Sequence, residues 1–139
     1  TEDQGWVGWF CKKALETSQD HTTQFTISGS GRQVRDVLHA SDVVRLYFLI
    51  SDNINELSGE AYNIGGGMEN SLSLLELFEF LEKKLNIKLQ YKRLSPRQSD
   101  QLIFVADNRK IMSRIPWKPL ISSNEGISQL IHWMKSTQE

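Results

Sequence analysis

The sequence contains one cysteine, three prolines and no long apolar run. The single Cys11 excludes a disulfide within the chain, and it fits a reducing compartment or a small buried apolar side chain. The longest apolar run, residues 43–50, is interrupted by Arg45 and is far shorter than the roughly 20 residues of a membrane-spanning helix. Sixteen Lys and Arg oppose 17 Asp and Glu, for a net charge of −1. This balance leaves no electrostatic footprint for nucleic acid or an anionic membrane.

Catalytic constellations are also lacking. The three histidines are far apart in the sequence and do not have the spacing of metal ligands. No Ser–His–Asp or Cys–His arrangement stands out, and no tyrosine is followed by a lysine four residues later. From the residues alone we therefore assign no catalytic, cofactor-binding or metal-binding side chain. We expect the chain to bind a small anionic ligand instead.

The hydrophobic pattern predicts an α/β fold of short strands with packed helices. The length, 139 residues, is that of one domain. Apolar residues spaced by three and four positions predict helices, and alternating residues predict strands. The predicted helices cover residues 5–16, 41–51, 74–85, a short stretch between 107 and 116, and 126–136. The predicted strands cover residues 25–28, 34–38, 61–64, 88–94 and 102–105.

Two further expectations concern particular segments. The helix at 41–51 is apolar nearly all round, so we expect it to be buried, with Ser41 and Asp42 as its cap. The chain begins at Thr1 with no initiator methionine and no signal-peptide pattern, so we expect it to start within a longer protein.

A glycine turn at residues 29–31 joins the first two predicted strands. Glycine suits such a turn because it adopts positive φ at little cost. Arg35 follows on a half-buried strand, where a guanidinium can hold a phosphate or carboxylate with two parallel hydrogen bonds. The alternative is a structural ion pair between Arg35 and Asp36 or Asp42.

Three other features each allow a functional and a structural interpretation. Glycines 65–67 lie before a helix that has a Ser73–Glu76 capping box. A glycine loop before a helix can hold a phosphate. The favoured explanation, however, is that the backbone of these glycines packs closely against another layer of the fold. Arg97 lies on a predicted loop and is a second candidate anion ligand, or else it pairs with Asp100. The aromatic residues near the start, including Trp6, either pack in the core or form a wall against a nucleobase or sugar.

The order of these motifs resembles that of the nucleotide-sugar epimerases and dehydratases, which are extended short-chain dehydrogenase/reductases. Residues 29–42 resemble the family's G-x-G-x-Q-x-R-D segment with its downstream aspartate. Residues 62–77 resemble its Y-N-x-G-G and S-x-x-E-L segments, and residues 97–119 resemble its R-x-x-D, A-D and W-x-P tail. The opening residues 3–10 further resemble a subgroup of CDP-sugar 2-epimerases.

The resemblance implies a ligand and a set of residues that bind it. The ligand would be a nucleotide-diphosphate sugar, most closely a CDP-sugar, whose phosphates are held by Arg35 and Arg97. The strand before the glycine turn, residues 26–28, would lie along the nucleotide, and residues 4–9 would lie near the sugar and base. The implied substrate-binding residues are Arg35, Arg97, Thr26, Ile27, Ser28, Gln33, Asp100 and Trp6.

The resemblance also implies that NAD binding and catalysis depend on another part of the protein. In the family an N-terminal half carries the glycine-rich NAD loop and the catalytic Tyr-x-x-x-Lys, and neither pattern occurs here. We therefore expect residues 1–139 to be the C-terminal substrate-binding half of an extended Rossmann-type epimerase, with the cofactor domain missing and no NAD bound by this chain. Strand 61–64 would join the sheet of that cofactor domain.

The expected partners and setting follow. Exposed strand edges and apolar helices favour a homodimer or a segment-swapped oligomer. We expect a cytoplasmic protein without nucleic-acid or membrane partners. The alternative is a non-catalytic protein-interaction domain, in which Arg35 and Arg97 do not converge.

Overall fold

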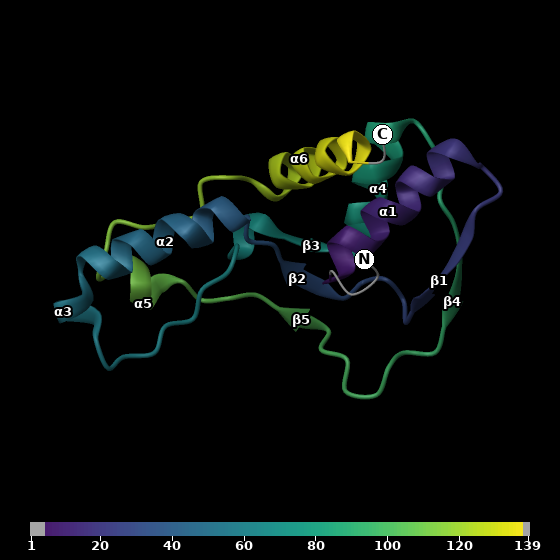
Figure 1. Ribbon diagram of the computed structural model, residues 1–139. Coiled ribbons are helices and arrows are strands. Elements are labelled where there is room, and N and C mark those ends of the chain that lie inside the picture. Colours follow the sequence, from purple (N-terminus) through teal and green to yellow (C-terminus); the bar gives the residue numbers. More distant parts are fainter. Residues whose placement is uncertain (1–4, 138–139) are drawn as a thin grey trace. The chain divides into compact units, whose positions relative to one another are not determined.

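Segments that are far apart in the sequence combine into two structural units. The computed structural model describes residues 5–137. Within these, the first unit comprises residues 5–33, 73–102 and 124–137, and the second comprises residues 34–72 and 103–123 (Figure 1). Both units mix short strands with helices, so the predicted α/β class is confirmed.

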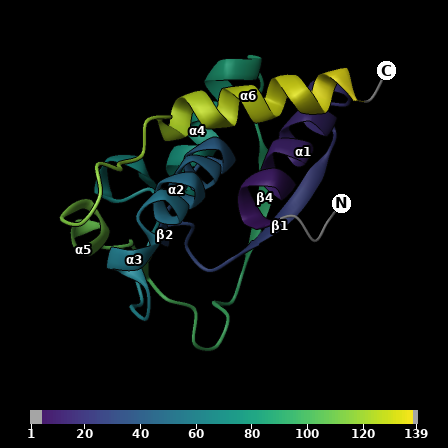
Figure 2. The same cartoon turned by 60° about the vertical axis from the view of Figure 1, so that its left-hand side comes forward.

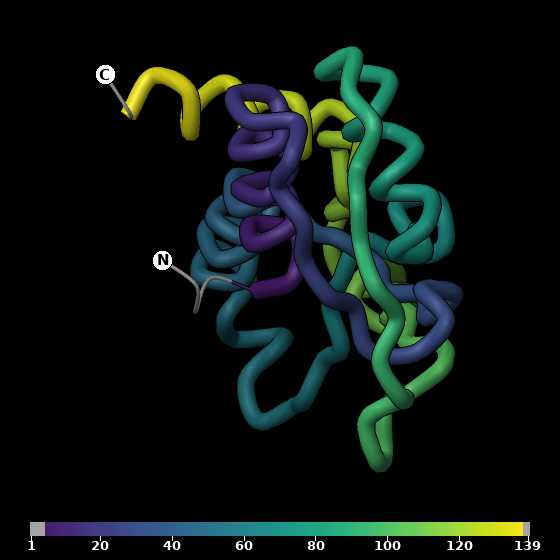
Figure 3. Tube along the Cα trace, turned by 90° about the vertical axis from the view of Figure 1, so that its right-hand side faces the viewer, coloured from purple at the N-terminus to yellow at the C-terminus, as the bar shows by residue number. Residues whose placement is uncertain are grey.

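The first unit is built on two parallel strands. Strands β1 (Gln24–Ser28) and β4 (Gln90–Leu94) pair in register from Gln24 opposite Gln90 to Ser28 opposite Leu94. They run side by side in the tube view (Figure 3). Three helices complete the unit: α1 (Gly5–Gln19), α4 (Leu74–Leu85) and, from residue 124 onward, α6 (Ser123–Ser136).

Aromatic rings form the centre of the first unit. The Phe10 ring lies 5.0 Å from that of Phe78 and 5.8 Å from that of Phe25, measured between centroids. Trp9 packs edge-on against Phe10, and Tyr91 closes the cluster from β4. Core packing is therefore the correct interpretation for Trp9 and Phe10. The capping box predicted for α4 is present, because Ser73 Oγ accepts from the Glu76 amide and the Glu76 carboxylate accepts from the Ser73 amide.

The second unit contains a three-stranded sheet and a separate apolar core. The strands are β2 (Val34–Asp36), β3 (Ser71–Ser73) and β5 (Ile103–Phe104), in the order β3-β2-β5, with β2 and β5 parallel. Its helices are α2 (Ala40–Asp52), α3 (Ile54–Leu57) and α5 (Arg109–Met112), and η1 (Met68–Asn70) is a 3₁₀ turn. Helices α2, α3 and α5 come together around one cluster (Figures 1 and 2). The buried residues of that cluster are Leu46, Leu57, Ile111, Ile115 and Trp117.

Two predictions about the second unit are wrong. Helix α2 is not buried all round: Val44, Tyr47 and Phe48 are 52%, 65% and 70% exposed, because the described chain covers only one side of the helix. Residues 61–64 are not a strand, since a strand requires a hydrogen-bonded neighbour and residues 5–137 provide none there. Their side chains nevertheless pack against the core, through Tyr62 and Ile64.

Smaller differences concern the ends of elements. The predicted strands at 34–38 and 102–105 shorten to residues 34–36 and 103–104. Helix α2 is capped by His39, whose Nδ1 accepts from the Ser41 amide at 3.2 Å, and not by Ser41 or Asp42. The Asp42 carboxylate instead accepts hydrogen bonds from Arg45 and from the amides of Leu120 and Ile121.

Candidate functional site

The carboxyl ends of β1 and β4 lie at the same edge of the first unit. Because the strands are parallel, the segments that follow them, residues 29–33 and 95–100, are brought together there. The Gly29 amide donates to the Leu94 carbonyl at 3.0 Å and extends the ladder by one bond. Gly29 and Gly31 have φ of +76° and +80°, so the predicted glycine turn is confirmed. In α/β proteins ligands commonly bind beyond the carboxyl ends of parallel strands.

Gln33 connects these two segments. Its Nε2 donates to the carbonyl of Ser28 at 2.8 Å and to Oδ2 of Asp100 at 3.2 Å. The structure thus brings Ser28, Gln33 and Asp100 together, three of the residues that the resemblance assigned to the site. Thr26 is exposed on the same strand, whereas the Ile27 side chain is 2% exposed and belongs to the core. Ile27 can therefore contact a ligand only through its backbone.

Arg97 lies on the exposed loop that follows β4. Its carbonyl accepts from the Asp100 amide at 3.2 Å, which closes a turn. Within residues 5–137 the Arg97 guanidinium forms no ion pair or hydrogen bond, so the predicted alternative of an Arg97–Asp100 pair is wrong. The side chain has the charge and the exposure that an anion ligand requires.

Arg35 lies on β2, in the second unit. One of its guanidinium nitrogens, Nη1, donates to the Val34 carbonyl at 2.8 Å. Asp42, one of the two partners considered from the sequence, pairs with Arg45 at 2.8 Å. Asp36, the other, accepts from two backbone amides.

The glycine loop at residues 65–67 is held by one polar side chain at each residue. Gly65 exchanges two hydrogen bonds with the Asn108 amide group, the Gly66 carbonyl accepts from Asn70, and the Gly67 amide donates to Asp36. A Cβ on Gly65 would lie 2.2 Å from Asp36 Oδ2, and one on Gly66 would lie 2.1 Å from a backbone carbonyl. Glycine is therefore required at residues 65 and 66 because their backbone lies too close to its neighbours to leave room for a side chain.

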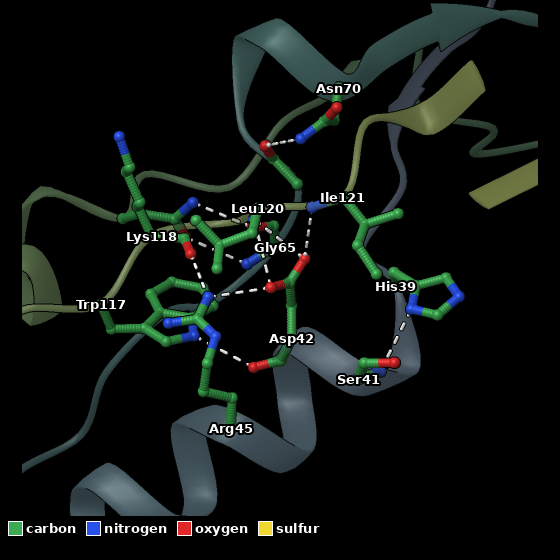
Figure 4. A network of polar contacts seen from close by, with 12 residues as sticks. His39, Ser41, Asp42, Arg45, Gly65, Asn70, Trp117, Lys118, Leu120 and Ile121 are labelled. Atoms are coloured by element: carbon green, nitrogen blue, oxygen red, sulfur yellow. Dashed lines mark hydrogen bonds and ion pairs between the residues drawn. The ribbon is translucent and has the colours of Figure 1, made fainter. Parts of the chain in front are cut away.

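A buried network around Asp42 joins two motifs that are far apart in the sequence (Figure 4). The Asp42 carboxylate accepts from the amides of Leu120 and Ile121 at 3.0–3.1 Å and from Arg45 at 2.8 Å. Its carbonyl accepts from the indole of Trp117 at 3.0 Å. Burial raises the pKa of Asp42, but these hydrogen bonds and the charge of Arg45 lower it by more, so the pKa lies below its ordinary value. This network ties the segment that contains Trp117, Leu120 and Ile121 to the start of α2.

The remaining candidates have simple outcomes. Trp6 is partly exposed on the first turn of α1. Burial raises the pKa of Cys11 to about 12, so this thiol is a core side chain and is not reactive. Across residues 5–137 no cluster of His, Cys, Asp and Glu could hold a metal ion, and no helix there is long and apolar enough to span a membrane.

Sequence reasoning missed the two asparagines that hold the glycine loop. Asn70 and Asn108 are 7% and 8% exposed, and both bond to backbone groups of residues 65–66. The Asn108 contact spans 43 residues of sequence, so no local pattern marks it.

Known proteins share both the sequence and the fold of this chain. The sequence model of the NAD dependent epimerase/dehydratase family matches residues 2–65. CDP-paratose 2-epimerase of Salmonella typhi is 51% identical over 136 residues, which cover 98% of this chain and 40% of that protein. UDP-glucuronate 4-epimerase of Thermodesulfobacterium geofontis is 30% identical over 113 residues, covering 81% of this chain and 34% of that protein.

A solved structure supports the same relationship at the level of the fold. UDP-glucuronic acid 4-epimerase of Bacillus cereus, in complex with UDP-glucuronic acid and NAD, superposes with a TM-score of 0.82 at 22% identity. The match covers 98% of this chain and 41% of that one.

The fold is that of a part of the extended Rossmann-type epimerases, and the sequence matches lie in nucleotide-sugar epimerases. The first part of the chain matches the NAD dependent epimerase/dehydratase family, and almost the whole chain is similar to the C-terminal part of CDP-paratose 2-epimerase of Salmonella typhi. It spans about two fifths of the length of that relative.

Proposed function

We propose that this chain is the nucleotide-sugar-binding portion of an NAD-dependent epimerase that acts on a CDP-sugar. The observation that carries the proposal is the 51% identity to CDP-paratose 2-epimerase over almost the whole chain. The candidate site adds an exposed arginine at the carboxyl edge of two parallel strands, where an anion can be reached by a guanidinium.

In this proposal Arg35 and Arg97 neutralise the two phosphates. Guanidinium groups bind phosphate oxygens with two parallel hydrogen bonds, which fixes orientation as well as charge. The backbone of residues 26–28 lies along the nucleotide, with Gln33 and Asp100 beside it. Trp6 lies near the sugar or base.

The Gly65–Gly67 loop does not fit the phosphates of NAD. A phosphate-binding glycine loop needs free backbone amides. In the Gly65–Gly67 loop, however, the amides of Gly65 and Gly67 already donate to Asn108 and Asp36. NAD, which accepts and returns a hydride in such reactions, would be bound by polypeptide outside this chain. The chain itself would contribute binding energy and orientation, and would be inactive alone.

The uncovered surfaces of the second unit support a partner. The outer face of α2 is exposed, and the backbone of residues 61–64 has no backbone hydrogen-bond partner within residues 5–137. We propose that cofactor-binding polypeptide covers them in the whole enzyme, and that the isolated chain self-associates as a homodimer or by exchange of segments. The single, buried cysteine fits a cytoplasmic enzyme.

Titration calorimetry with CDP tests the proposal. Arg35→Ala and Arg97→Ala should each weaken CDP binding by about 1.5–3 kcal/mol, the value of a charged hydrogen bond. Lys88→Ala is the control, because Lys88 is exposed and pairs with Glu82 outside the motifs. Unchanged affinity in both site variants would contradict the proposal and favour a protein-interaction domain. UDP in place of CDP tests which base is preferred.

A further inference from the structure

The amide nitrogen of Gln33 is fully committed to the protein. This nitrogen carries two hydrogens, and the two acceptors within reach are Ser28 O and Asp100 Oδ2. Exchanging the oxygen and nitrogen of the amide would turn an acceptor toward both of these oxygens, so the network fixes the orientation. The Oε1 atom is out of contact with solvent and has no donor among residues 5–137. Gln33 therefore has no N–H left to donate to a ligand, and its oxygen is not open to solvent.

The bonds of Gln33 act on the loop that carries Arg97. Residues 95–100 are held at their start, where the Gly29 amide donates to the Leu94 carbonyl at 3.0 Å. They are held at their end by the bond from Gln33 to Asp100. Arg97 lies between these two points and has no side-chain bond of its own within the described chain.

The neighbouring glycine makes room for this link. A Cβ on Gly29 would lie 3.3 Å from Gln33 Nε2 and 3.8 Å from the backbone of Pro96. The turn, the Gln33 side chain and the start of the loop are thus packed against one another. Without the link, ordering the loop would cost conformational entropy when an anion binds.

From this geometry we infer that Gln33 is a positioning residue: it ties the Arg97 loop to the end of β1 and does not contact the ligand. The inference rests on the proposed function, in which Arg97 binds the diphosphate. It changes the role of Gln33 from a substrate contact to a residue that acts through Arg97.

A double-mutant cycle with CDP as the probe tests this role. Gln33→Met keeps the side-chain length and removes both donors, and it should weaken CDP binding roughly 2- to 10-fold, the cost of ordering a loosened side chain and loop. In an Arg97→Ala background the same change should have no further effect. A general loss of stability would not produce this non-additivity.

The matched control is Gln24→Met. Gln24 lies at the start of β1 and donates to Gln90 of β4, at the end of this strand pair that is opposite to the Gln33 link. It should leave CDP affinity unchanged in both backgrounds.

Trypsin cleavage after Arg97 gives a second readout that needs no ligand. Gln33→Met should accelerate this cleavage, and Gln24→Met should not. Gln33→Glu should also accelerate it, because two carboxylates would then face each other across this link. Far-ultraviolet circular dichroism confirms that each variant is folded, and Gln33→Glu replaces Gln33→Met if the latter does not fold.

Three outcomes would overturn the inference. One is unchanged cleavage in the Gln33 variants. Another is a loss of CDP affinity in Gln33→Met that adds fully to that of Arg97→Ala, because this would indicate direct contact. The third is a loss in Arg97→Ala with none in Gln33→Met. If Arg97→Ala leaves CDP affinity unchanged, the proposed function fails, and the trypsin result alone decides whether Gln33 holds the loop.

Discussion

Asn108 and Gly65 exchange two hydrogen bonds, as two amides do when they face each other. Asn108 Nδ2 donates to the Gly65 carbonyl at 2.9 Å, and the Gly65 amide donates to Asn108 Oδ1 at 3.0 Å. Both residues are buried, so neither backbone group can turn to water instead. One side chain thereby fixes the entry to the glycine loop.

Replacing Asn108 with alanine should lower the free energy of unfolding by about 2–4 kcal/mol. Both polar groups of Gly65 would lose their partner, and an unpaired buried group costs about 1–3 kcal/mol. Urea unfolding followed by circular dichroism measures the loss. Asn63→Ala is the control, since Asn63 is exposed and should stay within about 0.5 kcal/mol of the parent. Equal stability of the two variants would contradict this account of Asn108.

Gly66→Ala should cost more stability than Gly59→Ala. At Gly66 a Cβ would lie 2.1 Å from the carbonyl oxygen of Val37, which is backbone and must move. At Gly59 φ is +81° but no atom lies within 4 Å, so only the backbone strain of about 1–2 kcal/mol applies. Thermal unfolding of both variants ranks the two effects. A Gly59→Ala loss equal to or above that of Gly66→Ala would show that the close approach is not needed.

Features that depend on a few neighbouring residues could be predicted from the sequence. The Ser73–Glu76 capping box spans four residues, and the glycine turn at 29–31 requires only positive φ, so both were predicted. The strand at 61–64 and the burial of α2 were predicted wrongly, because each depends on a neighbour that the described residues do not supply.

The candidate site divides in the same way. The resemblance assigned Ser28, Gln33 and Asp100 to it, and the structure brings these three together. The sequence could not reveal that Gln33 binds the protein on both sides, because its bond to Asp100 spans 67 residues. The binding roles of Arg35 and Arg97 stay predictions.

Stability should fall in acid because of Asp42. The carboxylate is 2% exposed, and its hydrogen bonds hold its pKa below the ordinary value of 3.8. A carboxyl group whose pKa is lowered by folding stabilises the fold above its unfolded pKa, and this contribution disappears as the pH falls through the folded pKa. Urea unfolding between pH 6 and pH 2.5 should therefore show a loss that begins near pH 4. Asp42→Asn should be less stable at pH 6 and should lose less on acidification. A parallel pH dependence in both proteins would exclude Asp42 as the cause.

The exposed face of α2 should make the isolated chain self-associate. Val44, Tyr47 and Phe48 recur at spacings of three and four residues, so they lie on one side of the helix. A shallow hollow runs along this face, lined by Ala40, Ser41, Val44, Arg45, Phe48, Leu49 and Asp52. Exposed apolar surface of this kind favours burial against another molecule.

Phe48→Ser should shift the chain toward the monomer, since Phe48 is 70% exposed and contributes the largest apolar ring on this face. Sedimentation velocity over a hundredfold range of concentration measures the shift. Leu120→Ser is the matched control, because Leu120 is 62% exposed but lies outside the helix. A parent chain that stays monomeric at the highest concentration would contradict self-association. An equal effect of both substitutions would instead show that association is not specific to α2.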